Sequence, residues 1–455
     1  MSAAAATGRP KQGTAPSGGS AVHEVTSVGA NISLGCIADD FTGATDLANN
    51  LVRAGMRVVQ AIGVPTKPLD AGADAVVVAL KSRTLPKDQA IAQSLAALSW
   101  LQAQGAQQIY FKYCSTFDST AQGNIGPVTE ALMDAMGTDF TIATPAFPDN
   151  QRTVFKGHLF VGDVLLSESG MQNHPLTPMT DANLVRVLQA QCQRKVGLLD
   201  YKVVALGEAV ISARIDALRE QGVGIAIVDA TSNDDLLRLG PALKGMPLVT
   251  AGSGVAIGLP ANWQLKPTGS ASDLPAPMGF QAVVSGSCSM ATNRQVASFI
   301  ALGRPALALD PLQIAQQAAA GIDGVAQALA WAAPRLLQGP VLIYSSADAS
   351  AVKTVQGALG ADAAGALVER TLAAIAHGLV ALGVRQLVVA GGETSGACVQ
   401  ALNITQMKIG PQIDPGVPWC HAFTDAAPDG GLHLALKSGN FGGDDFFTQA
   451  FTRLA

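Results

Sequence analysis

The stretch LGCIADDFTGATD, residues 34–46, decides the fold class. Its first five residues are apolar or small, which is long enough for a buried strand, and two carboxylates, Asp39 and Asp40, follow at once. Thr42 and Gly43 then lead into a pattern typical of a helix. Open α/β sheets hold ligands at this junction between a strand end and a helix start. The stretch therefore predicts an α/β fold with a polar ligand site beside the two carboxylates.

Short apolar runs alternate with longer Ala- and Leu-rich segments along the rest of the chain. Residues 87–104 illustrate the longer segments, because apolar side chains recur there at the spacing of one helical face. This alternation indicates βαβ units and a mostly parallel sheet with right-handed crossovers. We expect strands at residues 34–38, 58–62, 75–80, 108–112, 140–143, 224–228 and 247–250, and again at 282–285, 306–309, 341–345, 386–390 and 432–436.

A linker composition, PTGSASDLPAPMG, occupies residues 267–279. At 455 residues the chain is long enough for two domains, which we place at 31–266 and 280–455. We expect two doubly wound, mostly parallel-sheet domains with a ligand cleft between them. Residues 1–30 are rich in Ala, Gly, Ser and Pro and predict a disordered tail rather than a secretory signal.

Composition excludes several classes of protein. A net charge of −5 gives no reason to expect a nucleic-acid partner, and no apolar stretch reaches the 18 or more residues of a membrane span. Six cysteines stand singly without metal-binding spacing, which predicts reduced thiols in the cytoplasm and makes a zinc site improbable. Charged residues are sparse at 14%, which suggests extensive buried sheet and a possible homo-oligomer.

The two carboxylates have two interpretations. Asp40 or Thr42 is suited to cap the following helix without any further role. Alternatively, because adjacent residues of an extended segment point to opposite sides, one of Asp39 and Asp40 meets a ligand while the other serves the structure. The ligand-facing carboxylate would align an acceptor hydroxyl or accept its proton.

Cations and hydroxyls follow two further predicted strands. Lys81 and Arg83 come after residues 75–80, where they would hold a substrate carboxylate or else lie in a solvated loop. Lys112 opens a segment rich in Ser, Thr and Asp that extends to Thr120. Such a segment suits either turn chemistry or recognition of a sugar acid, and its place beside the Asp site favours recognition.

Glycines and hydroxyls mark the second half of the chain. The segment GGETSG, residues 391–396, follows an apolar run and precedes a helical pattern, so its N–H groups are suited to approach a phosphate. It matches neither GxxxxGK[ST] nor GxGxxG. Ser285 to Ser289 follow another strand, and Lys437 is placed to neutralise a transferring phosphate. Asp444 is one candidate for holding magnesium, although the sequence does not identify the metal ligands.

Six blocks in this order carry a resemblance to a known family. The chain resembles the four-carbon acid sugar kinase family from about residue 34 to about residue 447. The matching blocks are Asp39-Asp40-Phe41-Thr42-Gly43-Ala44, Phe111 to Thr120, Gly123 to Pro127, Ser285 to Ser289, Gly391 to Gly396, and Leu436 to Gly442. The resemblance implies ATP-dependent phosphorylation, with Mg²⁺, of the terminal hydroxyl of a four-carbon 3-oxo acid. It places the acid sugar in the N-terminal domain and ATP in the C-terminal domain.

The same resemblance, together with the residue types, names the site residues. Asp39 and Asp40 are the catalytic candidates. The substrate-binding candidates are Arg83, Lys112, Ser115, Asp118, Ser119, Asn124 and Arg152. The ATP-binding candidates are Ser285, Ser287, Gly391, Gly392, Glu393, Thr394, Lys437, Gly439 and Asn440.

Two positions depart from the family pattern, and three alternatives stay open. Gln122 stands where the family carries Arg, which supports an oxo-acid branch, and Gln151 stands where it carries Gly. The near alternative is a kinase for a reduced acid such as threonate or erythronate. A nicotinamide-dependent sugar-acid dehydrogenase is disfavoured by the absence of GxGxxG, and a periplasmic sugar-acid binding protein by the absence of an export signal in the sequence.

Overall fold

The computed structural model describes residues 1–5, 8, 32–66, 72–173, 177–346 and 349–454. The tail expected over 1–30 falls almost wholly outside these ranges. The strands are β1 (Leu34–Ala38), β2 (Val58–Ile62), β3 (Ala75–Ala79), β4 (Gln108–Lys112), β5 (Thr141–Thr144), β6 (Arg152–Phe155), β7 (His158–Val161), β8 (Val164–Leu165), β9 (Lys195–Leu199), β10 (Val223–Val228), β11 (Leu248–Ala251), β12 (Phe280–Ser285), β13 (Ala306–Ala308), β14 (Val341–Tyr344), β15 (Val384–Ala390), β16 (Gln406–Asp414), β17 (Val417–Ala422) and β18 (Leu432–Lys437).

The helices alternate with these strands, as the sequence predicts. They are α1 (Phe41–Arg53), α2 (Lys87–Ala103), α3 (Ile125–Met136), α4 (Leu184–Gln189), α5 (Tyr201–Val204), α6 (Glu208–Glu220), α7 (Asn233–Ala242), α8 (Met290–Ala301), α9 (Pro311–Ala319), α10 (Gly324–Leu336), α11 (Ala349–Leu359), α12 (Ala361–Ala381), α13 (Gly392–Ala401) and α14 (Phe446–Thr452). The predicted α/β class with a mostly parallel sheet is confirmed.

One sheet runs through both halves of the molecule. Among the described residues it has fifteen strands in the order β13-β14-β12-β15-β18-β17-β16-β2-β3-β1-β4-β11-β5-β10-β9. Within this sheet the other described strands pair in parallel, and the hairpin β16–β17 introduces the antiparallel pairs, with β18 on one side and β2 on the other. The halves are therefore joined by strand pairing at β2–β16, which the sequence did not predict. A separate sheet of three antiparallel strands, β6-β7-β8, lies in the N-terminal half. The domain boundary at 267–279 stays a prediction.

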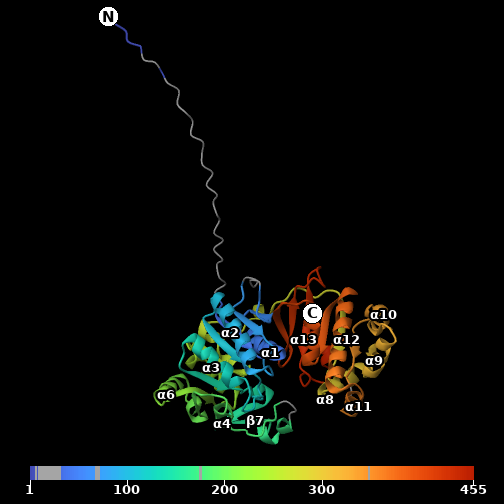
Figure 1. Ribbon diagram of the computed structural model, residues 1–455, viewed down its shortest axis with the longest axis horizontal. Helices are drawn as coiled ribbons and strands as arrows, with labels where there is room; N and C mark the ends of the chain where they lie inside the picture. The colour runs from blue at the N-terminus through green and yellow to red at the C-terminus, as the bar shows by residue number, and fades with distance from the viewer. Residues whose placement is uncertain (6–7, 9–31, 67–71, 174–176, 347–348, 455) are drawn as a thin grey trace.

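Two helices that follow the key motifs meet where the halves join. Helix α1 begins directly after Asp40 and α13 directly after Gly391. The two helices contact each other, and Figure 1 shows them side by side between the blue-green half and the orange-red half. Asn49 of α1 also donates a hydrogen bond to Gln412 of β16 at 2.6 Å. This arrangement brings the carboxylate motif and the glycine motif to one place.

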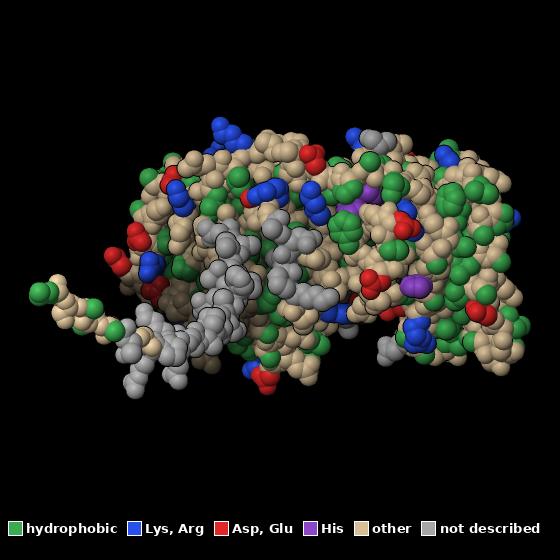
Figure 2. All heavy atoms as spheres, turned by 90° about the horizontal axis from the view of Figure 1, so that it is seen from above, with side chains coloured by type: hydrophobic (Ala, Val, Ile, Leu, Met, Phe, Trp, Pro, Cys, Tyr) green, Lys and Arg blue, Asp and Glu red, His purple; other side chains and the backbone are tan. Residues whose placement is uncertain are grey.

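The strands of the sheet are covered by helices, and the core is correspondingly apolar. All five residues of β1 are buried, as are the last five residues of β15. Residues 363–381 of α12 are long and apolar enough to cross a membrane by length and composition alone, but α12 packs against α13, α10 and α11 within the fold. On the face shown in Figure 2, Lys and Arg side chains are interspersed with Asp and Glu.

Candidate active site

Arg83 organises the carboxylates at the end of β1. Its Nε and Nη2 donate to the two oxygens of Asp39 at 3.0 and 2.8 Å, and Nη2 also donates to Asp40 at 2.6 Å. Burial raises the pKa of Asp39 above its usual value even though Arg83 opposes the shift. Burial acts in the same direction on Asp40, but the positive charges of Arg83 and Lys112 outweigh it and lower the pKa of that carboxyl. Asp40 is therefore ionised at neutral pH.

Asp40 has both of the roles considered from the sequence. Its carboxylate accepts hydrogen bonds from the Gly43 N–H at 3.1 Å and the Thr42 hydroxyl at 3.0 Å, so it caps α1. The same residue also lines, with Thr42, a cavity of about 530 Å³ that we call the junction cavity. Asp39 does not line this cavity and is bound to Arg83. The geometry thus divides the pair into a cavity-facing carboxylate and an internal one.

Three of the predicted substrate-binding residues are engaged within the protein. Arg83 donates to Asp39 in the bidentate manner that we expected for a substrate carboxylate. The Asn124 amide group donates to three backbone carbonyls, those of Ser82, Arg83 and Leu85. Ser119 is buried and accepts a hydrogen bond from Gln191 at 2.7 Å. Asn124 and Arg83 fix the loop after β3, and Ser119 is bound by Gln191, so all three side chains have internal partners; their contact with substrate stays a prediction.

Lys112 lies against the first turn of α1. Its amine donates to the Tyr113 carbonyl at 2.7 Å, and the residue is 2% exposed. A Cβ atom at Gly43 would stand 2.8 Å from this amine, so the glycine permits the close approach. Lys112 therefore places a buried positive charge beside the carboxylates of Asp40 and Asp46.

Asp46 is a candidate that sequence analysis missed. One of its oxygens accepts a hydrogen bond from the Ser253 hydroxyl, and the other is buried without a partner among the described residues. Burial raises the pKa of Asp46 to about 6, although Lys112 acts in the opposite direction. The only sign of Asp46 in the sequence was its position on the first turns of the helix that follows Asp40. Its partner Ser253 lies 207 residues away along the chain.

The remaining acceptor-side candidates lie near this cluster. Ser115 and Asp118 are half-buried, and Asp118 accepts a hydrogen bond from Thr116 at 2.6 Å. Arg152 donates to the Asn150 carbonyl, while its Nε is buried without a partner in the part of the chain that the structure describes. Gln151 adopts a φ of 58°, so the tight turn is kept although the residue is not glycine. Of these, the unpartnered donor of Arg152 best fits an anionic ligand.

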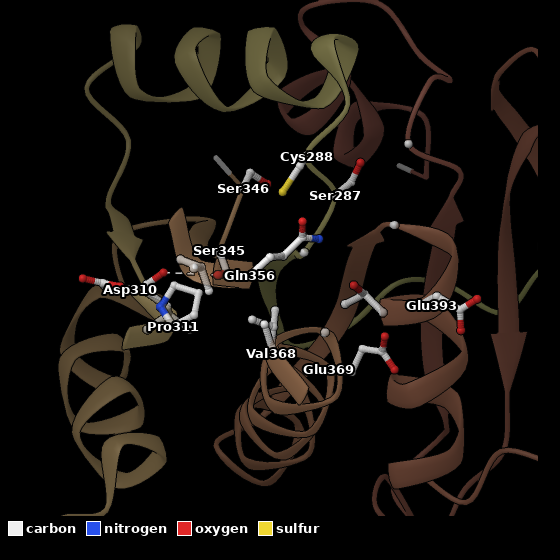
Figure 3. Close-up of a pocket in the computed structure, with 18 of the residues that line it drawn as sticks. Ser287, Cys288, Asp310, Pro311, Ser345, Ser346, Gln356, Val368, Glu369 and Glu393 are labelled. Atoms are coloured by element: carbon white, nitrogen blue, oxygen red, sulfur yellow. Dashed lines mark hydrogen bonds between the residues drawn. The ribbon is translucent and has the colours of Figure 1, made fainter. Parts of the chain in front are cut away.

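A second cavity, of about 770 Å³, lies in the C-terminal half and is called here the nucleotide cavity. Its lining includes the predicted residues Ser287, Gly391, Gly392, Glu393, Thr394 and Gly439. Figure 3 shows Glu369 and Glu393 on one side of this cavity and Asp310 with Pro311 on the opposite side. A volume of this size suits a small-molecule ligand.

Glycines that allow the backbone to approach closely line the side of the nucleotide cavity at the start of α13. Gly391 has a φ of 119° and begins α13 without a side-chain cap, which leaves N–H groups of the first turn to a ligand. A Cβ atom at Gly439 would stand 2.6 Å from the Ser287 hydroxyl oxygen. Ser285 is buried and hydrogen-bonds to Ser346 at 2.8 Å, so it supports the lining rather than facing the cavity.

Two residues of the last block, Lys437 and Asn440, and the nearby Asp444 lie outside the nucleotide cavity lining. Lys437 is fully buried and its amine donates to the Thr292 hydroxyl and to three carbonyls at 2.9–3.1 Å, so it holds the loop after β18 instead of facing a phosphate. Burial lowers the pKa of Lys437 to about 7. Asn440 is exposed outside the nucleotide cavity lining, and Asp444 pairs with Arg294 at 2.8 Å.

The junction cavity and the nucleotide cavity adjoin. Both are lined by Glu369, Gly392 and Glu393. A Cβ atom at Gly392 would meet only the Thr42 methyl group, at 4.0 Å, so the two motifs face each other directly. Lys81, from the loop after β3, reaches across and pairs with Glu393 at 2.6 Å. A group held at the start of α13 would therefore face Asp40.

Comparisons with known proteins distinguish the same two halves of the chain. A family model described as a sugar-binding N-terminal domain matches residues 34–259, and one described as a nucleotide-binding C-terminal domain matches residues 282–447. A protein of Burkholderia multivorans called 3-oxo-tetronate kinase is 61% identical over 425 residues, 92% of this chain and 97% of that protein. A protein of the same name from Pseudomonas fluorescens is 58% identical over 428 residues, 93% of this chain and 97% of that protein.

Two solved structures share the fold along nearly the whole chain. One, from Salmonella typhimurium LT2, has a TM-score of 0.83 at 45% identity and covers 92% of this chain and 98% of its own. The other, from Haemophilus influenzae, has a TM-score of 0.78 at 45% identity and covers 92% of this chain and 100% of its own.

Proposed function

Because the chain belongs to the four-carbon acid sugar kinase family and is a kinase, we propose that it transfers the γ-phosphate of ATP to the terminal hydroxyl of 3-oxo-tetronate. The product would be 3-oxo-4-phosphotetronate. We place the acid sugar on residues 31–266 and ATP on residues 280–455. We expect the enzyme to act in the cytoplasm on small molecules, and a homo-oligomer stays a prediction.

One observation carries this proposal: the junction cavity extends from Asp40 to the start of α13. Asp40 is ionised and lines one side, while Gly392 and Glu393 line the other side and also line the nucleotide cavity. Phosphoryl transfer needs an acceptor oxygen, the γ-phosphate and the leaving oxygen roughly in line, with little covalent participation by protein. Two adjoining cavities with Asp40 and Gly392 at their junction support that geometry.

On the acceptor side, Asp40 would align the terminal hydroxyl and take its proton as the new P–O bond forms. Arg83 keeps this carboxylate ionised, and Lys112 adds positive charge at the first turn of α1. Arg152, with its unpartnered buried Nε, is the candidate for the carboxylate of the acid. Asp118 is a candidate for its one other hydroxyl, and the Ser115 hydroxyl for its oxo group.

Magnesium fits one pair of carboxylates. Glu369 of α12 and Glu393 of α13 line the nucleotide cavity and the junction cavity, and burial together with the charge of Glu393 raises the pKa of Glu369. Mg²⁺ is typically bound by one or two carboxylates together with phosphate oxygens. When bound, it neutralises phosphate charge. Glu369 and Glu393 would hold it, and they replace Asp444 as candidates.

A coupled assay of ADP formation tests the proposed function. The protein is mixed with Mg-ATP and each of three acids: 3-oxo-tetronate, threonate and erythronate. We expect kcat/KM to be highest for the oxo acid, and ³¹P NMR to show a phosphomonoester on the terminal carbon. A higher kcat/KM for a reduced acid would assign the alternative substrate, and absence of acid-dependent ADP formation with all three would reject the proposal.

A further inference from the structure

The nucleotide cavity lacks positively charged side chains among its described lining residues. In the part of the chain that the structure describes, no Lys or Arg lines it, whereas three carboxylates do: Asp310, Glu369 and Glu393. ATP brings several negative charges into this cavity, and the transferring phosphoryl group needs positive charge about its equatorial oxygens. Magnesium neutralises part of that charge, and a protein cation near the γ-phosphate would neutralise more of it.

Two of the cations suggested by the sequence, Lys437 and Arg83, are bound by internal partners. Lys437 is buried and donates to a hydroxyl and three carbonyls. Arg83 is bound by Asp39 and Asp40. Moving either cation toward a phosphate would leave buried carbonyls or carboxylates without their partner, which is unfavourable for buried charges above all.

Lys81, in contrast, is not held by buried partners. Among the described residues it is the only Lys or Arg that lines either the junction cavity or the nucleotide cavity. It belongs to the N-terminal half, yet its amine lies 2.6 Å from the Glu393 carboxylate at the first turn of α13. The side chains of both residues are largely exposed, 79% and 64%. An exposed ion pair of this kind contributes little to stability, so Lys81 can exchange Glu393 for another anion at little cost.

We propose that Lys81 is a catalytic residue that leaves Glu393 and binds the γ-phosphate of ATP from the acid-sugar side of the junction cavity. This role rests on the proposed kinase function. As the acceptor oxygen bonds to the γ-phosphorus and the bond to the leaving ADP oxygen breaks, the hydroxyl proton passes to Asp40 and the Lys81 ammonium stays protonated. Glu393, once released, is available to magnesium.

The test is Lys81→Met with Lys87→Met as the matched control. Lys87 is an exposed lysine at the start of α2 that lines neither cavity. We expect Lys81→Met to lower kcat with 3-oxo-tetronate by roughly a hundredfold or more, the scale for removing one group that stabilises developing charge. Lys87→Met should stay within about twofold of wild type, and Lys81→Arg should retain part of the activity because it keeps the charge.

A second readout does not depend on the acid. Isothermal titration with Mg-ATP and Mg-ADP should show that Lys81→Met weakens ATP binding about tenfold more than ADP binding, since only ATP carries the γ-phosphate. If Lys81→Met behaves like Lys87→Met in both measurements, the proposal is overturned. A loss of turnover with an unchanged ratio of ATP to ADP affinity also overturns it, because Lys81 would then act on the acid. If wild-type protein does not phosphorylate the oxo acid, the proposed function fails while the titration still decides the role of Lys81.

Discussion

The acceptor side and the nucleotide side of the junction are built in opposite ways. Around Asp40 the protein gathers charged side chains of both signs, and Arg83 and Asp39 neutralise each other there. The nucleotide cavity has glycines, hydroxyls and carboxylates, and no Lys or Arg among its described lining residues. The acceptor side therefore carries its own cations, including Arg152, whose buried Nε has no partner among the described residues, whereas positive charge at the nucleotide side would have to arrive with magnesium or from the other half.

This difference explains why similar residue types have different roles on the two sides. Arg83 and Lys437 both looked like ligand cations in the sequence, but each one satisfies internal acceptors. Lys81, which lies in an exposed ion pair, lines the junction cavity and contacts Glu393, a residue that lines both cavities. We therefore expect the cations that stabilise the fold, such as Arg83, to differ from the cation that binds the ligand, Lys81. The variants below test this difference.

Removing the internal cation should damage stability most. Arg83→Met leaves the buried carboxylates of Asp39 and Asp40 uncompensated, which is expected to lower the free energy of unfolding by about 3–5 kcal/mol. Chemical denaturation measures this loss. Arg219→Met, which removes a more exposed ion pair with Asp139, should change the free energy of unfolding little. Equal effects of the two variants would contradict the internal role of Arg83.

Removing the cavity-facing carboxylate should damage turnover. Asp40→Asn is expected to lower kcat by roughly a hundredfold or more, the scale of a group that handles a proton, while the affinity for Mg-ATP stays near that of wild type. Steady-state kinetics and isothermal titration give the two quantities. The control is Asp134→Asn, an exposed carboxylate paired with Arg194. Wild-type turnover in Asp40→Asn would leave the cap as the only role of Asp40.

The raised pKa of Asp46 predicts a dependence of stability on pH. The folded pKa of about 6 exceeds the usual unfolded value of about 3.9, so between these values the folded state binds more protons than the unfolded state. The contribution to stability is fully present below about pH 4 and is lost as pH rises through 6. Asp46→Asn should remove this slope and raise the free energy of unfolding at pH 7 by about 2–3 kcal/mol.

A carboxylate with the opposite shift provides the control for Asp46. The backbone and side chain of Arg57 lower the pKa of Asp74 despite its partial burial, so Asp74 stabilises the fold above its unfolded pKa. Asp74→Asn should therefore lower the free energy of unfolding at pH 7. Denaturation curves from pH 4 to pH 7 compare the variants, and an unchanged slope in Asp46→Asn would assign the pH dependence to other groups.

Blocking the nucleotide side should affect ligand binding more than folding. A side chain at Gly392 has space, since its Cβ would meet only Thr42 at 4.0 Å, and the residue does not need a positive φ. Gly392→Val should keep its circular dichroism spectrum but lose the rise in Tm that Mg-ATP gives, about 2–4 °C per kcal/mol of lost binding. Gly392→Ala is the control that retains most of the shift. An unchanged shift in the valine variant would mean that the glycine segment is only a turn.

Much of the fold could be predicted because buried parallel strands are continuous apolar runs. β1, β2 and β4 begin and end at the residues expected from the sequence. β16 and β17 could not be predicted, because prolines at 411 and 418 and shifts of register near Gln412 break the alternation of an antiparallel hairpin. These two strands are also the ones that join the halves.

The sequence predicted those site residues whose position depends on the neighbouring strand and helix. It did not predict the contacts of residues whose partners lie far away along the chain. Asp40 lies between β1 and α1, and Gly392 is the first residue of α13, so their place at the junction follows from the sequence pattern. The partners of Arg83 and Lys81 lie 44 and 312 residues away along the chain. No local spacing couples such positions, and only the folded arrangement shows which cation is already bound and which is available.

Phosphoryl transfer between Asp40 and Gly392 is tested most directly by the structure of a ternary complex with the oxo acid and a non-hydrolysable ATP analogue. We expect the γ-phosphate in the junction cavity, near Gly392, with the terminal hydroxyl of the acid between it and Asp40. A γ-phosphate bound instead at the loop of Lys437 and Asn440, with the acid remote from Asp40, would contradict this expectation.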